Sequence, residues 1–274
     1  MKKILLTFDG VHFSEGAFEF ARRLNEQQRI LITGVFLPQV NYANLWSYSG
    51  GAAEPLFIPT VENSVTADIE KNIALFESLC RKNNIDYCVH KDFFNLALPE
   101  FRNETRFADL AILGSETFYK NLGTGEPNEY LKDALHAAEC PVLVVPEKFD
   151  FPESNVLAYD GSDSSVFAIK QFAYLFPSLL YNETLLVTVQ KEEAVPLPNG
   201  QYIEELVSRH FPRHTLLKLD TNRQKHFSEW INDRKNPVLV TGAFGRSFLS
   251  QMFKRSFISD VIHDNKLPVF ITHR

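Results

Sequence analysis

Residues 4–10 read Ile-Leu-Leu-Thr-Phe-Asp-Gly, and residues 155–161 read Asn-Val-Leu-Ala-Tyr-Asp-Gly. Each stretch is a short run that ends in Asp-Gly, and apolar residues at helical spacing follow both. The two Asp-Gly pairs are 151 residues apart. Because this spacing is too long for the unit of a solenoid, the recurrence predicts a duplicated domain.

Two later phrases recur in the same order and support the duplication. Ala-Ile-Leu-Gly at 111–114 is echoed by Leu-Val-Thr-Gly at 239–242, and Cys-Pro-Val-Leu-Val-Val at 140–145 is echoed by Leu-Pro-Val-Phe-Ile-Thr at 267–272. We therefore expect one domain over residues 1–148 and a second over 153–274. The segment between them contains proline and charged residues, as linkers commonly do.

Apolar runs alternate with helical patterns in each half. Runs that are apolar throughout indicate strands covered on both faces, and hence a parallel sheet. After its opening run, the first half has predicted strands at 30–36 and 86–90 and two more that end at Gly114 and Val145. The second half has predicted strands at 184–189 and 215–219 and two more that end at Gly242 and Thr272. The later predicted helices are 65–82, 97–106, 201–209 and 226–233. The fold class is therefore α/β, with two doubly wound, Rossmann-like domains of five parallel strands each.

The composition limits the classes of function. A hydrophobic fraction of 45% and a charged fraction of 23% are typical of a globular protein. The net charge of −6 argues against a nucleic-acid partner, which needs a basic surface to meet phosphates. No apolar run has the length that spans a bilayer, so we expect no membrane partner and a cytoplasmic location. The three cysteines lack metal-ligand spacing, which predicts reduced thiols and no metal site.

The first half is longer between its first and fourth strands, and the surplus falls mostly in residues 38–59. This stretch contains a Gly-Gly pair, three prolines and several aromatic residues. It is interpreted as a long loop inserted after the second strand. Two roles stay open: a lid over a ligand or partner, or a loop that its aromatic side chains hold against its own domain.

Ligands of doubly wound sheets bind beyond the carboxyl ends of the strands, where the strand order reverses. In the second half this point brings together Asp160-Gly161, the strand end near Val189 and the loop after Gly242. Gly242 and Gly245 are three residues apart, which allows the backbone to turn sharply and approach an anion.

The same loop leads into a helical pattern. Ser256 precedes an apolar helical face that begins with Phe257, so Ser256 is predicted to be an N-cap whose helix dipole points back at the crevice. Arg246, Lys254 and Arg255 add positive charge. Glycine turn, helix N-terminus and basic residues together predict a cradle for a triphosphate.

These features resemble the universal stress proteins. The shared elements are the Asp-Gly after the first strand, the Gly-x-x-Gly loop and the closing Leu-Pro-Val-Phe-Ile strand. A further shared element is Ser256, which is separated from Gly245 by nine residues and the motif position 255. The ATP-binding branch of that family carries Gly-x-x-Gly-x9-Gly-Ser/Thr. The resemblance covers nearly the whole chain as two tandem copies, and it implies the adenine nucleotide alpha hydrolase-like fold with the copies related by a pseudo-two-fold axis.

The resemblance also implies a ligand and the roles of particular residues. The ligand would be ATP, with Mg²⁺ as its companion ion, in a stress-response or regulatory protein. Gly242, Gly245 and Ser256 would line the phosphates, Asp160 would meet the ribose, and the backbone near Val189 would meet the adenine. One position departs from the motif, because its third glycine is Arg255 here. Either arginine strains a site that needs positive φ or close backbone approach, or its guanidinium pairs with phosphate.

The first half departs further from the motif. Its loop begins Gly114-Ser-Glu-Thr117, so the second glycine is absent, and Asn128-Glu129 falls where the family has Gly-Ser. We expect this half to be retained structurally but unable to bind nucleotide. The stretch Gly-Thr-Gly at 123–125 is interpreted as a plain turn rather than a phosphate loop.

No catalytic set emerges from the sequence. Asp9 and Asp160 each end a strand before a tight turn, which favours a turn-capping or ribose-binding role over that of a general base. His210 and His214 have the spacing of helix-borne metal ligands, but Pro212 between them breaks a helix, so they are interpreted as loop residues. We expect at most weak ATP hydrolysis.

Three functions remain in competition: an adenine-nucleotide-binding stress protein, a nucleotide-free scaffold of the same fold that acts through protein contacts, and a nucleotide hydrolase. The fifth strands, 142–145 and 269–271, are apolar at every position, whereas exposed edge strands usually carry charge. They predict an internal pseudo-dimer in which the two strands pair. A further homodimer and a client protein are left open.

Overall fold

The computed structural model describes residues 1–37, 63–91, 97–115, 134–190, 196–220, 230–231, 233–242 and 267–272. The insertion expected at 38–59 lies outside them, so neither of its two roles is tested. All structural statements below concern the described residues.

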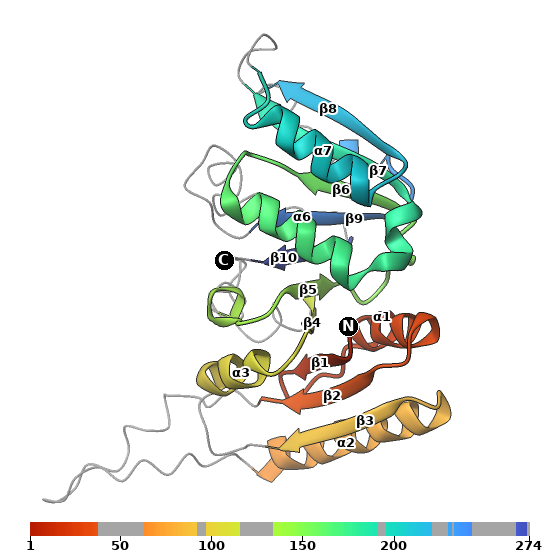
Figure 1. Cartoon of the computed structure of the whole chain (residues 1–274). Coiled ribbons are helices and arrows are strands. Elements are labelled where there is room, and N and C mark those ends of the chain that lie inside the picture. Colours follow the sequence, from red (N-terminus) through yellow and green to blue (C-terminus); the bar gives the residue numbers. More distant parts are fainter. Residues whose placement is uncertain are drawn as a thin grey trace, which may run out of the picture.

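The strands form a single ten-stranded sheet (Figure 1) with the order β3-β2-β1-β4-β5-β10-β9-β6-β7-β8. Their bounds are β1 Lys3–Phe8, β2 Leu31–Phe36, β3 Asp86–Lys91, β4 Leu110–Gly114, β5 Val142–Val145, β6 Ser154–Ala158, β7 Glu183–Gln190, β8 His214–Asp220, β9 Pro237–Gly242 and β10 Val269–Thr272. Neighbouring strands are parallel within each half, and β5 and β10 are antiparallel. The predicted α/β fold class is confirmed, and the ten predicted strands lie within a residue or two of their expected positions.

The helices are α1 Glu15–Gln27, α2 Asn63–Lys82, α3 Ala97–Arg106, α6 Asp163–Leu175 and α7 Gly200–His210, with a 3-10 helix, η2, at Pro177–Tyr181. The helices expected at 65–82, 97–106 and 201–209 are confirmed. The helix expected at 226–233 falls mostly outside the described residues. Ser14 caps α1 by accepting from the Ala17 N–H, and Ser162 caps α6 by accepting from the Ser165 N–H.

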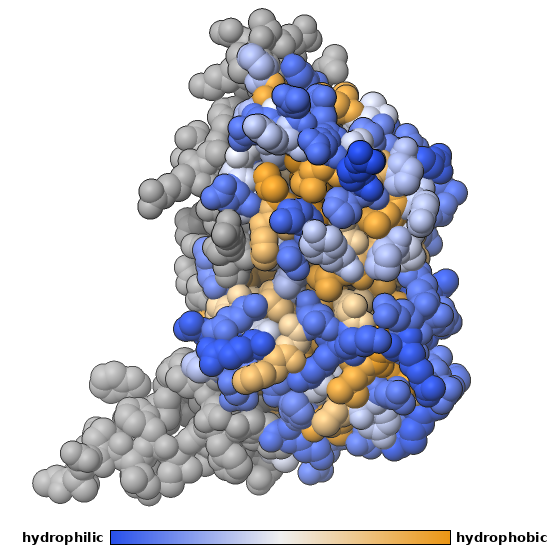
Figure 2. Space-filling view, in the orientation of Figure 1, coloured by the Kyte–Doolittle hydropathy of each residue, from blue (hydrophilic) through white to orange (hydrophobic). Residues whose placement is uncertain are grey.

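The core lies on both faces of the sheet, as parallel strands require. Ile4, Leu6 and Phe8 of β1 are buried beneath α1 and α2, whereas Leu5 between them faces a second cluster that includes Phe101 of α3. The second half repeats the arrangement, with α6 and α7 on the face shown toward the viewer in Figure 1. In the same orientation, Figure 2 shows a mostly hydrophilic surface with apolar side chains visible between the polar residues.

The two halves join through β5 and β10. Leu143 lies opposite Phe270, Val142 opposite Ile271 and Val144 opposite Val269. Phe270 is fully buried. Its ring packs edge-on against Phe172 of the neighbouring helix α6 and against Phe176, the C-cap residue of that helix. The expected pairing of these strands is therefore present, and it leaves β3 and β8 as the two ends of the sheet.

Within the described ranges, no helix combines the length and the apolar character needed to cross a bilayer.

Candidate functional site: the carboxyl edge of the second half

The chain order reverses at β6, which lies between β7 and β9. The turn after β6 is the first element of the expected site. Oδ1 of Asp160 accepts hydrogen bonds from the Ser162 N–H at 2.9 Å and the Ser162 hydroxyl at 2.5 Å. Asp160 therefore caps its own turn, which is one of the two roles expected for it; contact with a ribose stays a prediction.

Gly161 is needed by the geometry of this turn. Its φ of +81° is a conformation that side chains rarely adopt. A Cβ atom there would also lie 2.6 Å from Cβ of Pro198, in the segment that precedes α7. The end of β6 and the start of α7 are consequently packed against each other without room for a side chain.

Gly242 ends β9 and lies against the first turn of α6. A Cβ atom at this position would be 2.5 Å from the carbonyl carbon of Ser164 and 2.7 Å from the nitrogen of Ser165. Only glycine permits this approach, which places the carboxyl end of β9 beside the N-terminus of α6. The positive end of a helix dipole therefore adjoins the expected phosphate region.

The structure brings together part of the expected site. The backbone of Val189 lies on β7, one residue before that strand ends, and pairs with Leu219 of β8. The expected phosphate-loop residues lie outside the described residues: Gly245, Arg246, Arg255, Ser256 and Phe257.

Tyr159 is a residue of this region that the sequence interpretation missed. Its side chain is fully buried, and its hydroxyl donates to the carbonyl oxygen of Pro198 at 2.7 Å. Burial raises the pKa of Tyr159, and the neighbouring Asp160 carboxylate adds to the rise. The signal in the sequence was a hydroxyl at the position that Phe8 fills in the first half, because a buried polar atom needs a partner.

In the first half, the corresponding turn after β1 is held by hydrogen bonds of the Asp9 carboxylate. Oδ1 of Asp9 accepts from the N–H groups of Val11 and His12 at 3.0 and 2.7 Å, and Oδ2 lies 2.9 Å from Nδ1 of His12. The ring of Phe13 stacks on Phe8 at 4.8 Å between centroids. The expected turn-capping role of Asp9 is present here as well.

The N-terminus of α1 is likewise engaged by the chain itself. Oε2 of Glu147, which follows β5, accepts from the Gly16 N–H at 3.1 Å. A Cβ atom on Gly16 would lie 2.1 Å from the carbonyl oxygen of Pro146, so this segment is packed directly on the helix. A carboxylate at a helix N-terminus takes the place that an anionic ligand would favour.

Other expectations for the first half are only partly covered. Gly114 ends β4 as expected, whereas Glu116, Thr117, Asn128, Glu129 and the glycine turn at 123–125 lie outside the described residues.

The histidine pair requires one correction. His210 is the last residue of α7 and His214 the first residue of β8, so they are not loop residues. The helix ends at His210, before Pro212, so only one of the two histidines lies on it. Nδ1 of His214 lies 2.8 Å from the carbonyl oxygen of Phe211. Among the described residues, no group of three or more His, Cys, Asp or Glu side chains is arranged to hold a metal ion.

No protein-family model matches the sequence, and no curated protein matches it. Among solved structures, the crystal structure of a universal stress protein from Archaeoglobus fulgidus is similar, with a TM-score of 0.67 and 18% sequence identity over 99% of this chain and 96% of that chain. At this identity the likeness shows the fold. The chain has the α/β fold of that universal stress protein over nearly its whole length.

Proposed function

We propose that the chain is a tandem universal stress protein whose second half binds an adenine nucleotide, ATP first of all, in a stress-response or regulatory role. The observation that supports the proposal is the close approach of two elements at the carboxyl edge of the second half. There the tight end of β9 at Gly242 adjoins the N-terminus of α6.

Each part of the nucleotide has a proposed contact. Asp160 meets the ribose hydroxyls, and the backbone near Val189 meets the adenine. The phosphates lie against the loop from Gly242 through Gly245 to Ser256, with Arg246 and Arg255 supplying positive charge. Mg²⁺ bound with the nucleotide would neutralise phosphate charge. Because the sequence offers no catalytic set, we expect ATP hydrolysis to be weak at most.

Calorimetric titration of the full chain with ATP tests the proposal. The expected stoichiometry is one nucleotide per chain. Gly245→Val should abolish binding, because a side chain blocks close approach of the backbone to phosphate. Thr117→Val is the matched control, since Thr117 holds the corresponding place in the first-half loop, and it should leave the affinity unchanged. A stoichiometry of two would contradict the assignment to one half.

A second candidate function is favoured by Arg255, which replaces the third glycine of the motif. If arginine obstructs the loop, the chain is a scaffold of the same fold that acts through protein contacts. Absence of heat on titration, together with no nucleotide in the supernatant of the freshly purified and denatured protein, would support that function.

A further inference from the structure

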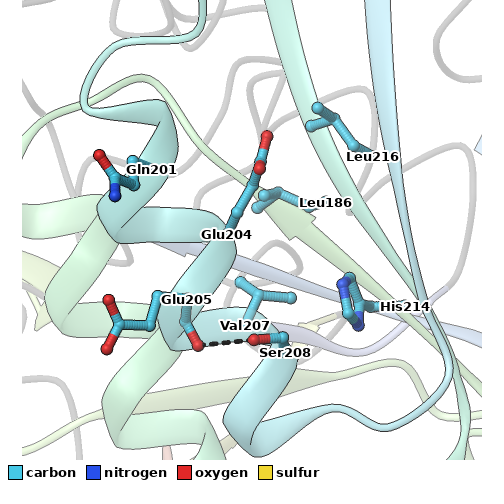
Figure 3. Close-up of a pocket in the computed structure, with 8 residues that line it drawn as sticks. All are labelled: Leu186, Gln201, Glu204, Glu205, Val207, Ser208, His214 and Leu216. Carbon is cyan, nitrogen blue, oxygen red and sulfur yellow. Dashed lines mark hydrogen bonds between the residues drawn. The ribbon is translucent and has the colours of Figure 1, made fainter.

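A groove of about 470 Å³ opens between α7 and the strands β7 and β8. Figure 3 shows its walls: Leu186 and Leu216 lie on the strands, and the helix presents polar side chains. Glu204 points to the strand side of α7, whereas Glu205 points to the opposite side. Both carboxylates line the groove, which therefore combines an apolar floor with two acidic side chains on its helix wall, Glu204 on the strand side.

The first half provides an internal template for this groove. Tyr87 of β3 pairs with Ile32, the second residue of β2, and His214 of β8 pairs with Thr184, the second residue of β7. The strands β2 and β7 in turn pair in the same register with β1 and β6. His214 is thus the structural counterpart of Tyr87.

In the first half, an aromatic ring and a cation fill the space between helix and strand. The ring of Tyr87 meets that of Phe76 edge-on at 5.9 Å, and its hydroxyl accepts from Nη1 of Arg81 at 2.9 Å. Arg81 also lies 3.5 Å from the carboxylate of Glu77. Ring, guanidinium and carboxylate form one connected group.

In the second half the carboxylate is kept. Glu77 lies ten residues before Tyr87, and Glu204 lies ten residues before His214. Within the part of the chain that the structure describes, Glu204 has no ion-pair partner. Glu204 is exposed, so its carboxylate attracts a cation with the modest strength of an exposed ion pair.

The ring and the guanidinium are lost. Ser208 lies six residues before His214, as Arg81 does before Tyr87, and its hydroxyl donates to the carbonyl oxygen of Glu205. The imidazole of His214 is smaller than a phenol ring and is directed to the backbone. These two replacements leave space beside β8, and the floor of the groove is formed by Leu186, which stands where the first half has Gly34.

We propose that this groove binds a segment of a partner protein in which an aromatic residue adjoins an arginine or lysine. The ring takes the place that Tyr87 fills in the first half, over Leu186 and Leu216. The cation pairs with Glu204 as Arg81 pairs with Glu77. Aromatic and arginine side chains are the residues that most often anchor protein interfaces. The proposal is independent of nucleotide binding, since none of the groove residues belongs to the proposed nucleotide site.

An NMR titration of the full chain with an acetylated, amidated Gly-Tyr-Arg-Gly peptide tests the proposal. Saturable shifts at the methyl groups of Leu186 and Leu216 are expected at millimolar peptide. The same peptide with alanine for tyrosine, or glutamate for arginine, should shift them much less. Equal effects from all three peptides, or shifts that do not saturate, would overturn the proposal.

Two variants locate the site. Glu204→Gln should weaken binding about three- to fivefold, the size of one exposed ion pair, and Glu205→Gln should weaken it less, because Glu205 lines the groove but points to the side of α7 away from the strands. Ser208→Arg combined with His214→Tyr restores the first-half group and should abolish binding without lowering the unfolding temperature. Unchanged binding in the double variant would contradict the proposal. A change of oligomeric state in it would instead identify the occupant as a second copy of this chain, which also overturns a partner-protein segment.

Discussion

Gln27 and Ser178 are hydrogen bonded, and they are 151 residues apart, the same offset as the two Asp-Gly pairs. A residue and its own counterpart can meet only close to the axis that relates two copies. The opposed pair Leu143 and Phe270, which hold the same place in the two fifth strands, identifies a second point on that axis. The local two-fold axis therefore passes between the paired strands β5 and β10, which we call the seam, and close to Gln27 at the C-terminal end of α1.

A lysine in this seam should destabilise the whole chain. Phe270 is fully buried, so Phe270→Lys places an unpaired charge in the core and should lower the free energy of unfolding by about 4 kcal/mol or more. Urea unfolding followed by circular dichroism measures the change. Phe107→Lys is the matched control, because Phe107 is 66% exposed and the same substitution there should have little effect. A stable Phe270→Lys variant with two separately unfolding halves would contradict the seam.

A methyl group at Gly242 should force the end of β9 away from α6. The Cβ atom of Gly242→Ala would lie 2.5 Å from a backbone carbon of Ser164, and the shift should cost about 1–3 kcal/mol. Gly200→Ala is the control, since a Cβ atom there meets only Leu197 at 3.4 Å and alanine favours a helix. Equal stabilities of the two variants in urea would show that β9 and α6 are not in tight contact.

Much of the fold could be predicted from sequence, because buried parallel strands and amphipathic helices leave strong periodic patterns. The start of α6 shows the limit. The repeat aligns Ser165 with Ser14, yet α6 is capped by Ser162, one turn earlier. Ser162 corresponds to Val11, which has no side-chain acceptor, so the first helix has to begin later. Such a difference depends on one hydroxyl and leaves no trace in the periodicity.

The candidate site was predictable only in outline. Asp-Gly and Gly-x-x-Gly indicated where a ligand would meet the chain, but could not reveal that Gly242 is also required by contact with α6. The hydrogen bond between Glu147 and the N-terminus of α1 was not predictable, since that contact joins residues 131 apart. The groove beside β8 was also missed, because it depends on Ser208 and His214, which stand where the first half has the larger Arg81 and Tyr87.

Glu139 should titrate far below an ordinary glutamate. Its carboxylate accepts from Arg106 and Arg102, and the two guanidinium groups lower its pKa from 4.5 to about 2. Because the pKa is lower in the folded state, the stabilisation is fully present above pH 4.5 and is lost as the pH falls through about 2. NMR titration of the side-chain carboxyl measures the midpoint. Arg106→Gln should move it upward, and an ordinary midpoint in the parent chain would exclude this ion-pair group.

Only one thiol per folded chain should react readily with an alkylating reagent. Cys88 is exposed on the edge strand β3, whereas Cys80 and Cys140 are buried. Burial raises the pKa of each buried thiol to about 12, which leaves almost no reactive thiolate at neutral pH. Mass spectrometry should find one modified cysteine in the native chain, three in urea, and none in native Cys88→Ser. Rapid native labelling of Cys140 would indicate that the core beside β5 opens.

The role of Arg255 rests on sequence, because Arg255 lies outside the described residues. If its guanidinium pairs with phosphate, Arg255→Ala should weaken ATP binding by about 1–3 kcal/mol and leave adenosine binding unchanged. If it obstructs the loop, Arg255→Gly should tighten ATP binding. Calorimetry of both variants separates the two, and equal affinities in all three proteins would show that the side chain points away from the nucleotide.

The seam between β5 and β10 also determines how the assembly responds to dilution. Two separate chains that met along such strands would come apart as their concentration fell, because their union would obey mass action. Here both strands belong to one polypeptide, so the joined state holds equally at trace and at high abundance. A cell that makes only a few copies of this protein would still contain complete ten-stranded molecules, and either half could change in sequence while its fifth strand continued to cover the edge of the other.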